Sequence, residues 1–336
     1  MIDLNEKVDF GKVSPFRTID REGFIFTSIT YPANVYDAIV IKYPRDIRCF
    51  SAMELGSKHS LETQINLINN LGIEKALIIA EDLEFITRCP TLKHLCVIPP
   101  DNVGNGFDYS PLYRMPQIIS LQCSTVYGYS EENSTLIDCS KIKGLESIHV
   151  TNTRYKNFQS VKTLKDLGIS HYGEQNLSNA FDSSMIDTLS IFQCKIKTLE
   201  GIEKSENMQC LYLYYNRSLK DITALGKVKK TLRALRIENC PKIEDFSILG
   251  ELENLELLEL SGSNVLPDLN FLKKMKSLKT FVFTMNVQNG DLSPCLSLSY
   301  VYSGRNRKHY NLKDSELPKG SYFRGNDNID EWRKRE

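Results

Sequence analysis

The sequence predicts an α/β repeat protein: a curved solenoid with a parallel β-sheet on its concave face and short 3-10 or irregular segments on its convex face. Three observations lead to this prediction. Apolar residues recur in the pattern L-x-x-L-x-L about every 22 residues, other residues alternate with them, and Asn or Cys often follows three positions later. One such unit cannot bury its own apolar face, so stacked neighbours must form the core together.

The apolar ladder is regular from residue 145 onward, with steps of 19 to 24 residues between first positions. Its first, fourth and sixth positions are predicted to point inward, and the residues between them outward along a short strand. The units are Leu145-Ile148-Val150, Leu164-Leu167-Ile169, Ile186-Leu189-Ile191, Met208-Leu211-Leu213, Leu232-Leu235-Ile237, Leu255-Leu258-Leu260, Leu278-Phe281-Phe283 and, more weakly, Leu298-Val301-Ser303. Less regular units precede them at Ile73-Ala76-Ile78, Leu92-Leu95-Val97 and Ile118-Leu121-Cys123.

The ninth position of each unit has a distinct predicted role. A side chain there can hydrogen-bond the backbone of the turn that leaves the strand, which would otherwise be buried unpaired. We therefore expect the cysteines at this position to be structural. The ninth residues are Thr153, Tyr172, Cys194, Asn216, Cys240, Ser263, Asn286 and Asn306.

The second half of several units shares the formula apolar, x, Asp, apolar, Ser/Thr/Asn, x, Leu, seen at 219–225, 243–249 and 266–272. This pattern resembles the 22-residue repeats of the internalin-like and SDS22-like leucine-rich-repeat proteins. The resemblance is strongest over 186–285 and extends more loosely over 73–185. It implies a right-handed curved array with 3-10 turns on its convex side, used for protein binding.

Three regions are predicted along the chain. Residues 1–60 form an N-terminal cap of short strands, at 23–27 and 38–42, followed by a helix that starts near residue 60 with Ser60 as N-cap and Gly72 as stop. Residues 61–304 form the repeat array, and residues 305–336 a C-terminal cap and polar tail. The tail contains Trp332 and nine basic against six acidic residues, so its net charge is +3.

Two units are longer than the rest, and the extra residues fall in 99–106 and 127–133. Insertions in solenoids lie in loops on one face, frequently the binding face. Long surface loops are also tolerated without any role. The sequence leaves both interpretations open.

Composition favours a cytoplasmic protein without nucleic acid or membrane partners. Basic and acidic residues balance at 42 each, so no global field attracts polyanions. The first residues lack a signal-peptide core, and no apolar run approaches a membrane span. The nine cysteines are scattered without C-x-x-C spacing, which predicts buried, reduced thiols. Oligomeric state is left open.

We expect no catalytic residue, no cofactor and no metal. The five histidines are dispersed, and no carboxylate or cysteine set completes a ligand cluster around them. The sequence also lacks a Gly-rich phosphate loop, G-x-S-x-G and H-E-x-x-H.

The outward strand positions three, five and seven predict where a partner would bind. Phe192, Tyr212 and Tyr214 place aromatic rings on neighbouring strands where polar residues are the default. Exposed tyrosines are enriched at binding hot spots, although aromatic residues also simply suit strand surfaces. The full set of predicted partner-binding residues is Phe192, Tyr212, Tyr214, Arg236, Glu238, Glu259, Tyr300 and Tyr302.

The sequence therefore predicts a non-catalytic protein-binding scaffold that recognises a partner through its concave face. A concrete version is a bacterial immunity or adaptor protein. The alternatives are a regulatory subunit that docks an enzyme, and a surface protein that binds a host ligand or glycan.

Overall fold

A computed structural model of the chain describes residue 2 and residues 18–29, 36–44, 56–99, 106–123, 136–151, 155–182 and 185–323. The chain divides into two compact units, residues 1–163 and 164–336. None of the helices within these described ranges is long and apolar enough to cross a membrane.

The first unit contains a sheet whose strand order is β1-β2-β3-β4-β5-β6-β8. Pairing is antiparallel from β1 to β3 and parallel from β3 to β8. The strands are β1 (Thr18–Arg21), β2 (Phe24–Thr27), β3 (Ala38–Tyr43), β4 (Lys75–Ala80), β5 (His94–Val97), β6 (Ser120–Cys123) and β8 (Ser147–Thr151). The short strands β7 (Ile137–Asp138) and β9 (Tyr155–Lys156) pair separately, and 3-10 helices span Glu84–Arg88, Ser110–Arg114, Cys139–Lys141 and Phe158–Ser160.

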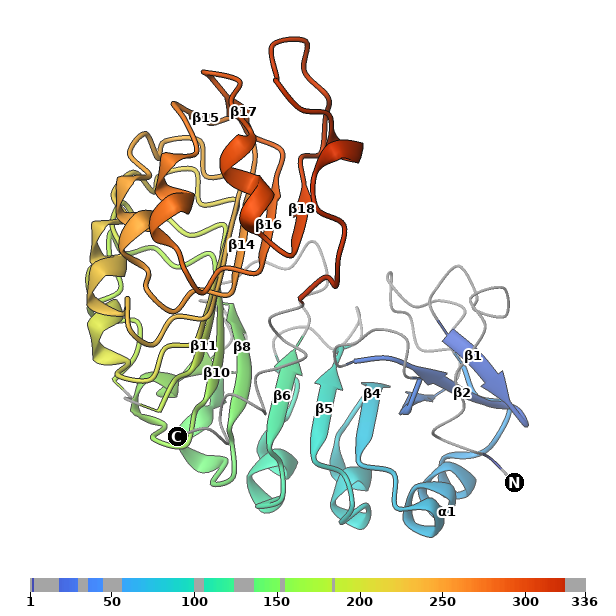
Figure 1. The fold of residues 1–336 in the computed structure, drawn as a ribbon. Helices are drawn as coiled ribbons and strands as arrows, with labels where there is room; N and C mark the ends of the chain where they lie inside the picture. Colours follow the sequence, from blue (N-terminus) through green and yellow to red (C-terminus); the bar gives the residue numbers. More distant parts are fainter. Residues whose placement is uncertain are drawn as a thin grey trace. The chain divides into compact units, whose positions relative to one another are not determined.

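Helix α1 (Leu61–Leu71) lies between β3 and β4 in the sequence and leads into β4 (Figure 1). The Ser60 hydroxyl accepts a hydrogen bond from the Thr63 backbone N–H at 3.2 Å and so caps the first turn. Gly72 ends the helix in the left-handed conformation, with φ of 64°. Both caps are the residues expected from the sequence. Strand β3, placed in the N-terminal cap by sequence, already pairs in parallel with β4, and the three predicted regional boundaries remain predictions.

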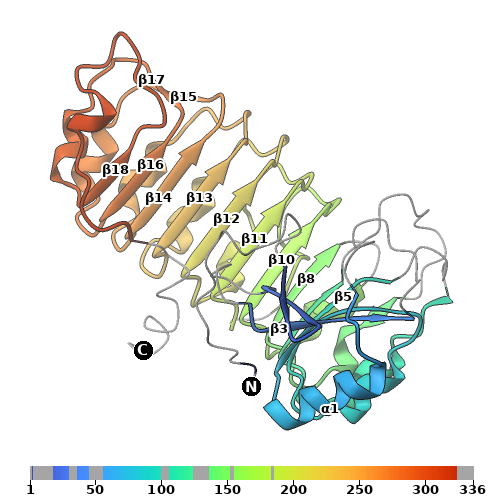
Figure 2. The ribbon, with the colours of Figure 1, turned by 90° about the vertical axis from the view of Figure 1, so that its right-hand side faces the viewer.

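The second unit is a stack of parallel strands in the order β10-β11-β12-β13-β14-β16-β18. Figure 2 shows these strands side by side, and Figure 1 shows the 3-10 helices on their outer side. The strands are β10 (Asp166–Ser170), β11 (Thr188–Phe192), β12 (Cys210–Tyr214), β13 (Ala234–Glu238), β14 (Leu257–Ser261), β16 (Thr280–Phe283) and β18 (Tyr300–Tyr302). A small pair is formed by β15 (Val265–Leu266) and β17 (Asn286–Val287), and 3-10 helices span Ile202–Lys204, Thr223–Lys227, Ser247–Glu251, Asn270–Lys274, Ser293–Ser297 and Asp314–Glu316.

The predicted inward ladder forms the core of the second unit. Leu211, Leu235 and Leu258 are paired in register on neighbouring strands, and each has no exposed surface. Ser303, the weakest ladder residue, is also buried at 2% exposure. Parallel strands on one side and 3-10 helices on the other confirm the leucine-rich-repeat solenoid.

The shared Asp of the repeat formula lies two residues before a 3-10 helix on the convex side in three repeats. Its carboxylate accepts a hydrogen bond from the backbone N–H two residues later and so pairs a donor that the helix start leaves unsatisfied. This contact joins Asp221 to Thr223 (2.8 Å), Asp245 to Ser247 (2.8 Å) and Asp268 to Asn270 (2.7 Å).

Three ninth-position side chains bond the backbone inside the solenoid as predicted: Cys194, Asn216 and Cys240. The Tyr172 hydroxyl and the Asn286 amide oxygen are buried without a hydrogen-bond partner among the described residues, so the prediction is wrong for these two groups. The fully buried Asn216 amide donates to the Ile191 carbonyl oxygen and accepts from the Cys194 N–H, both at 2.9 Å. The Cys240 thiol donates to the Glu238 carbonyl oxygen at 3.5 Å. These thiols are therefore structural, and burial raises the pKa of both cysteines to about 11.

The next unit shifts this role by one residue. Ser263 is exposed, whereas Asn264 is buried and donates to the carbonyl oxygens of Cys240 and Ile243 at 3.1 and 2.8 Å. The extra residue is accommodated at Gly262, whose φ of 136° favours glycine. The prediction for Ser263 is therefore wrong, and Asn264 makes the contact.

Replacing Asn216 by alanine should destabilise the protein strongly. The change leaves a buried carbonyl oxygen and a buried N–H without partners, which costs about 1 to 3 kcal/mol for each group. We expect the urea midpoint of unfolding to fall clearly for Asn216→Ala. The exposed Asn179→Ala is the matched control and should change stability by less than about 0.5 kcal/mol. Equal midpoints for the two variants would show that the ninth position is not structural.

Candidate functional site

In-register pairing in the second unit aligns the predicted partner residues in rows across the concave face. Each position-five residue lies beside the position-five residue of the next strand, and the same holds at position seven. The position-five row is Gly168, Ser190, Tyr212, Arg236, Glu259, Val282 and Tyr302. The position-seven row contains Ser170, Phe192, Tyr214, Glu238 and Ser261.

Arg236 and Glu259 form an ion pair near the centre of this face. The Arg236 Nε lies 3.0 Å from the Glu259 Oε2, and the two side chains are 21% and 24% exposed. The Arg236 guanidinium carbon also lies 5.1 Å from the centroid of the Tyr212 ring. Burial alone would lower the pKa of Arg236, but the Glu259 carboxylate, Tyr212 and Tyr214 together outweigh burial, so the pKa lies above its ordinary value. Arg236 therefore stays charged.

Tyr212 differs from the sequence expectation because it is only 4% exposed. It forms a hydrophobic cluster with Cys210, Ala234 and Leu257, outward residues from three neighbouring strands. Position three of these strands is therefore buried, although alternation along the strand predicted a solvated surface. The Tyr212 ring lies against the Arg236 guanidinium, and because Tyr212 is buried its ring offers a partner little surface.

Phe192 and Tyr214, the other two aromatic residues predicted on neighbouring strands, are half-buried. Tyr214 packs against the Tyr212 cluster, with ring centroids 6.3 Å apart. The Phe192 ring instead contacts Tyr215 edge-on at 5.8 Å. Tyr215 is 37% exposed and has a positive φ of 57°, which turns it toward Phe192 rather than along the alternating strand. The alternation of inward and outward residues along the strand therefore did not predict that Tyr215 contacts Phe192.

Glu238 ends strand β13 beside Tyr214 and is half-buried. The Asn239 amide donates to its carboxylate at 3.4 Å. Glu238 thus adds a carboxylate next to Tyr214.

Tyr300 and Tyr302, the last two predicted partner-binding residues, lie on β18 and flank one lysine. The Lys319 Nζ is 5.8 Å from the Tyr300 ring centroid and 5.6 Å from that of Tyr302. It also donates to the Asp314 carboxylate at 2.8 Å. The chain itself thus supplies a cation to these rings, although Tyr302 remains 44% exposed.

The C-terminal segment 317–323 contributes two further residues that the sequence did not single out. The Tyr322 hydroxyl donates to the Glu259 carboxylate at 2.5 Å, and the Phe323 N–H donates to the Thr280 hydroxyl oxygen at 3.0 Å. Phe323 also packs against the Tyr212 cluster. Because the Tyr322 ring also contacts Tyr300, the segment links Tyr300 to the Tyr212 cluster. The adjacent aromatic residues after Pro-Lys-Gly-Ser were the available signal.

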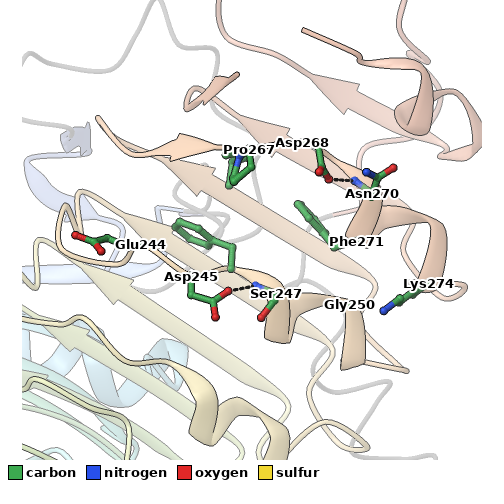
Figure 3. Close-up of a pocket in the computed structure, with 11 residues that line it drawn as sticks. Glu244, Asp245, Ser247, Gly250, Pro267, Asp268, Asn270, Phe271 and Lys274 are labelled. Atoms are coloured by element: carbon green, nitrogen blue, oxygen red, sulfur yellow. Dashed lines mark hydrogen bonds between the residues drawn. The ribbon is translucent and has the colours of Figure 1, made fainter. Parts of the chain in front are cut away.

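A pocket with a volume of about 280 Å³ lies on the convex side (Figure 3). It separates the 3-10 helices Ser247–Glu251 and Asn270–Lys274, and Phe246, Pro267 and Phe271 line it. The Asp245 and Asp268 carboxylates at its rim already accept backbone N–H groups of their own turns. The pocket is therefore a product of repeat stacking, with its polar rim used for folding.

Several predicted features lie outside the described residues. They are the loop 127–133, residues 100–105 of the loop 99–106, Cys49, Thr153 and Trp332.

No family model matches this sequence, and no curated protein matches it. Among solved structures, an internalin of Listeria monocytogenes, InlF, is similar over 76% of this chain and 76% of its own, with 18% identity and a TM-score of 0.41. Internalin C2 of the same bacterium is similar over 61% of this chain and 76% of its own, with 19% identity and a TM-score of 0.36. Toll, in the Drosophila Toll–Spätzle complex, is similar over 71% of this chain and 38% of its own, with 13% identity and a TM-score of 0.45. Likeness at this level concerns the fold alone, and the repeat fold of this chain rests on its ladder and sheet.

The buried Tyr212 predicts a pH dependence of stability. Burial raises its pKa well above the ordinary 10.0, so the folded state favours the neutral phenol. The stabilisation that comes from the difference between the folded and unfolded pKa of Tyr212 is fully present below about pH 10. It is lost as pH rises from there through the folded pKa, because Tyr212 ionises in the unfolded chain first. Tyr212→Phe should therefore lose less unfolding free energy than the wild type between about pH 8 and pH 11. Urea unfolding at both values measures the difference, with Tyr302→Phe as the exposed control. Equal losses for wild type and Tyr212→Phe would contradict the assignment.

Proposed function

We propose that the chain is a protein-binding scaffold whose partner surface is the concave face of the second unit. The observation that supports this most strongly is the Arg236–Glu259 ion pair with Tyr214 and Phe192 in the neighbouring row of the same face. Aromatic residues and arginine supply most of the energy at protein interfaces. A scaffold that holds them in register reduces the entropy lost on binding.

Within this proposal, the protein acts in the cytoplasm. Eight cysteines of the described ranges are buried and none of them is in a disulfide, which supports a reducing compartment. Within the proposal, the partner is a protein, and the role is that of an immunity or adaptor protein. Docking an enzyme as a regulatory subunit, and binding a host ligand or glycan at a surface, remain the alternatives.

An affinity purification with matched variants tests the proposal. The bait is the full chain, and the source is lysate of the native organism. The strand-face variant combines Phe192→Ala, Tyr214→Ala and Arg236→Ala. The control combines Phe271→Ala and Lys274→Ala on the convex side. Circular dichroism and thermal melting establish that each variant is folded.

We expect wild type and the convex control to capture one stoichiometric protein, and the strand-face variant to lose at least about tenfold in affinity for it. Such a loss follows if hot-spot residues are removed from the centre of the interface. Retention of the partner by a folded strand-face variant would contradict the proposal, and so would the recovery of no stoichiometric protein.

A further inference from the structure

The C-terminal segment first completes the edge of the sheet. The Val301 N–H donates to the Pro318 carbonyl oxygen at 2.8 Å, and the Gly320 N–H donates to the Ser299 carbonyl oxygen at 3.0 Å. A Cβ at Gly320 would lie 2.7 Å from that Ser299 oxygen, so this approach requires glycine. These contacts pair the otherwise open edge of β18 and need no residue beyond Gly320.

The segment then contacts the concave face of earlier strands. The Tyr322 ring meets Tyr300 edge-on at 5.1 Å, while its hydroxyl donates to Glu259. The Lys279 Nζ lies 5.0 Å from the centroid of the Phe323 ring. Tyr322 and Phe323 are both half-buried. Pairing of the β18 edge does not account for these contacts.

The residues that receive Tyr322 and Phe323 belong to the candidate partner surface. Glu259 is the acceptor of the phenolic hydroxyl and the ion-pair partner of Arg236. The cluster that receives Phe323 contains Tyr212 and is also covered by Tyr214. The chain thus covers part of its own candidate partner surface with Tyr322 and Phe323.

The bound segment shows which chemistry this surface accepts. A carboxylate fixed by an arginine accepts a phenolic O–H, and such charge-assisted bonds are among the stronger hydrogen bonds. The Thr280 hydroxyl oxygen accepts a main-chain N–H, as it would from any extended peptide. An apolar cluster with a lysine at its rim receives an aromatic ring. A phosphorylated tyrosine does not fit, because its charge would face the Glu259 carboxylate.

We propose that Tyr322 and Phe323 act as an intramolecular ligand, and that the partner is a protein that displaces them with an extended segment containing tyrosine followed by an aromatic residue. This inference rests on the proposed function of the concave face, for which it names the partner chemistry and a competing internal segment.

Competition by a tethered segment has a calculable size. A short tether holds its ligand at an effective concentration of about 1 mM. A free peptide with an intrinsic Kd of about 100 μM then binds the intact chain about tenfold more weakly than a chain whose segment no longer competes.

Fluorescence anisotropy with a labelled synthetic peptide, Lys-Gly-Ser-Tyr-Phe-Arg-Gly, tests this on the full chain. The peptide copies residues 319–325. The test variant is Tyr322→Ala/Phe323→Ala, which keeps the edge pairing through Gly320. The control is Ser321→Ala, an exposed neighbour. A single cooperative melting transition, lowered only slightly by the loss of the Tyr322 and Phe323 contacts, establishes that the double variant is folded.

We expect the double variant to bind the peptide about tenfold more tightly than wild type, and Ser321→Ala to match wild type. Adding Glu259→Gln to the double variant, or replacing the peptide tyrosine with phenylalanine, should each weaken binding by about tenfold. A phosphotyrosine peptide should bind most weakly of the set. Equal binding by wild type and the double variant, or binding unaffected by Glu259→Gln, would overturn the inference.

The two proposals fail in different ways. If the strand-face variant loses its captured protein but the double variant gains no peptide affinity, the intramolecular ligand is refuted and the scaffold proposal stands. If the strand-face variant keeps its captured protein, the scaffold proposal itself fails.

Discussion

The in-register parallel pairing of successive strands is the constraint on which the rest of the second unit depends. Each inward ladder residue lies beside its counterpart in the next repeat, as Leu211, Leu235 and Leu258 do. One repeat cannot exclude water from its apolar face alone, so burial forces neighbours into the same register. Because side chains alternate along a strand, a slip of one residue would turn this apolar set toward solvent.

The same register builds the outward face. Tyr212, Arg236 and Glu259 come from three separate repeats, yet the ladder places them in one row. The ion pair and the contact between guanidinium and ring follow from that placement. Buried ninth-position groups such as Asn216 hold the turns that leave the strands. Folding residues and candidate binding residues thus occupy opposite sides of the same short strands.

Sequence reasoning predicted the features that repeat and missed those that occur once. The ladder, the caps of α1 and the roles of Cys194 and Cys240 follow from local patterns, and the structure agrees with them. The rows of outward residues were also predictable. The burial of Tyr212 was not, because alternation states which side a residue faces and not what covers that side. The contact of Tyr322 with Glu259 spans 63 residues and has no periodic signal. The prediction for Ser263 was wrong because one extra residue at Gly262 shifts the ninth-position contact to Asn264.

Site-specific photocrosslinking tests the concave-face assignment most directly. Phe192 on the strand face and Phe271 on the convex side are both half-buried phenylalanines, so each can be replaced by p-benzoylphenylalanine with a similar local change. Irradiation of the two full-length proteins in native lysate is followed by identification of crosslinked proteins by mass spectrometry. A concave recognition surface predicts that position 192 crosslinks a single protein in high yield and that position 271 does not. Crosslinking of that protein from position 271 alone would contradict it.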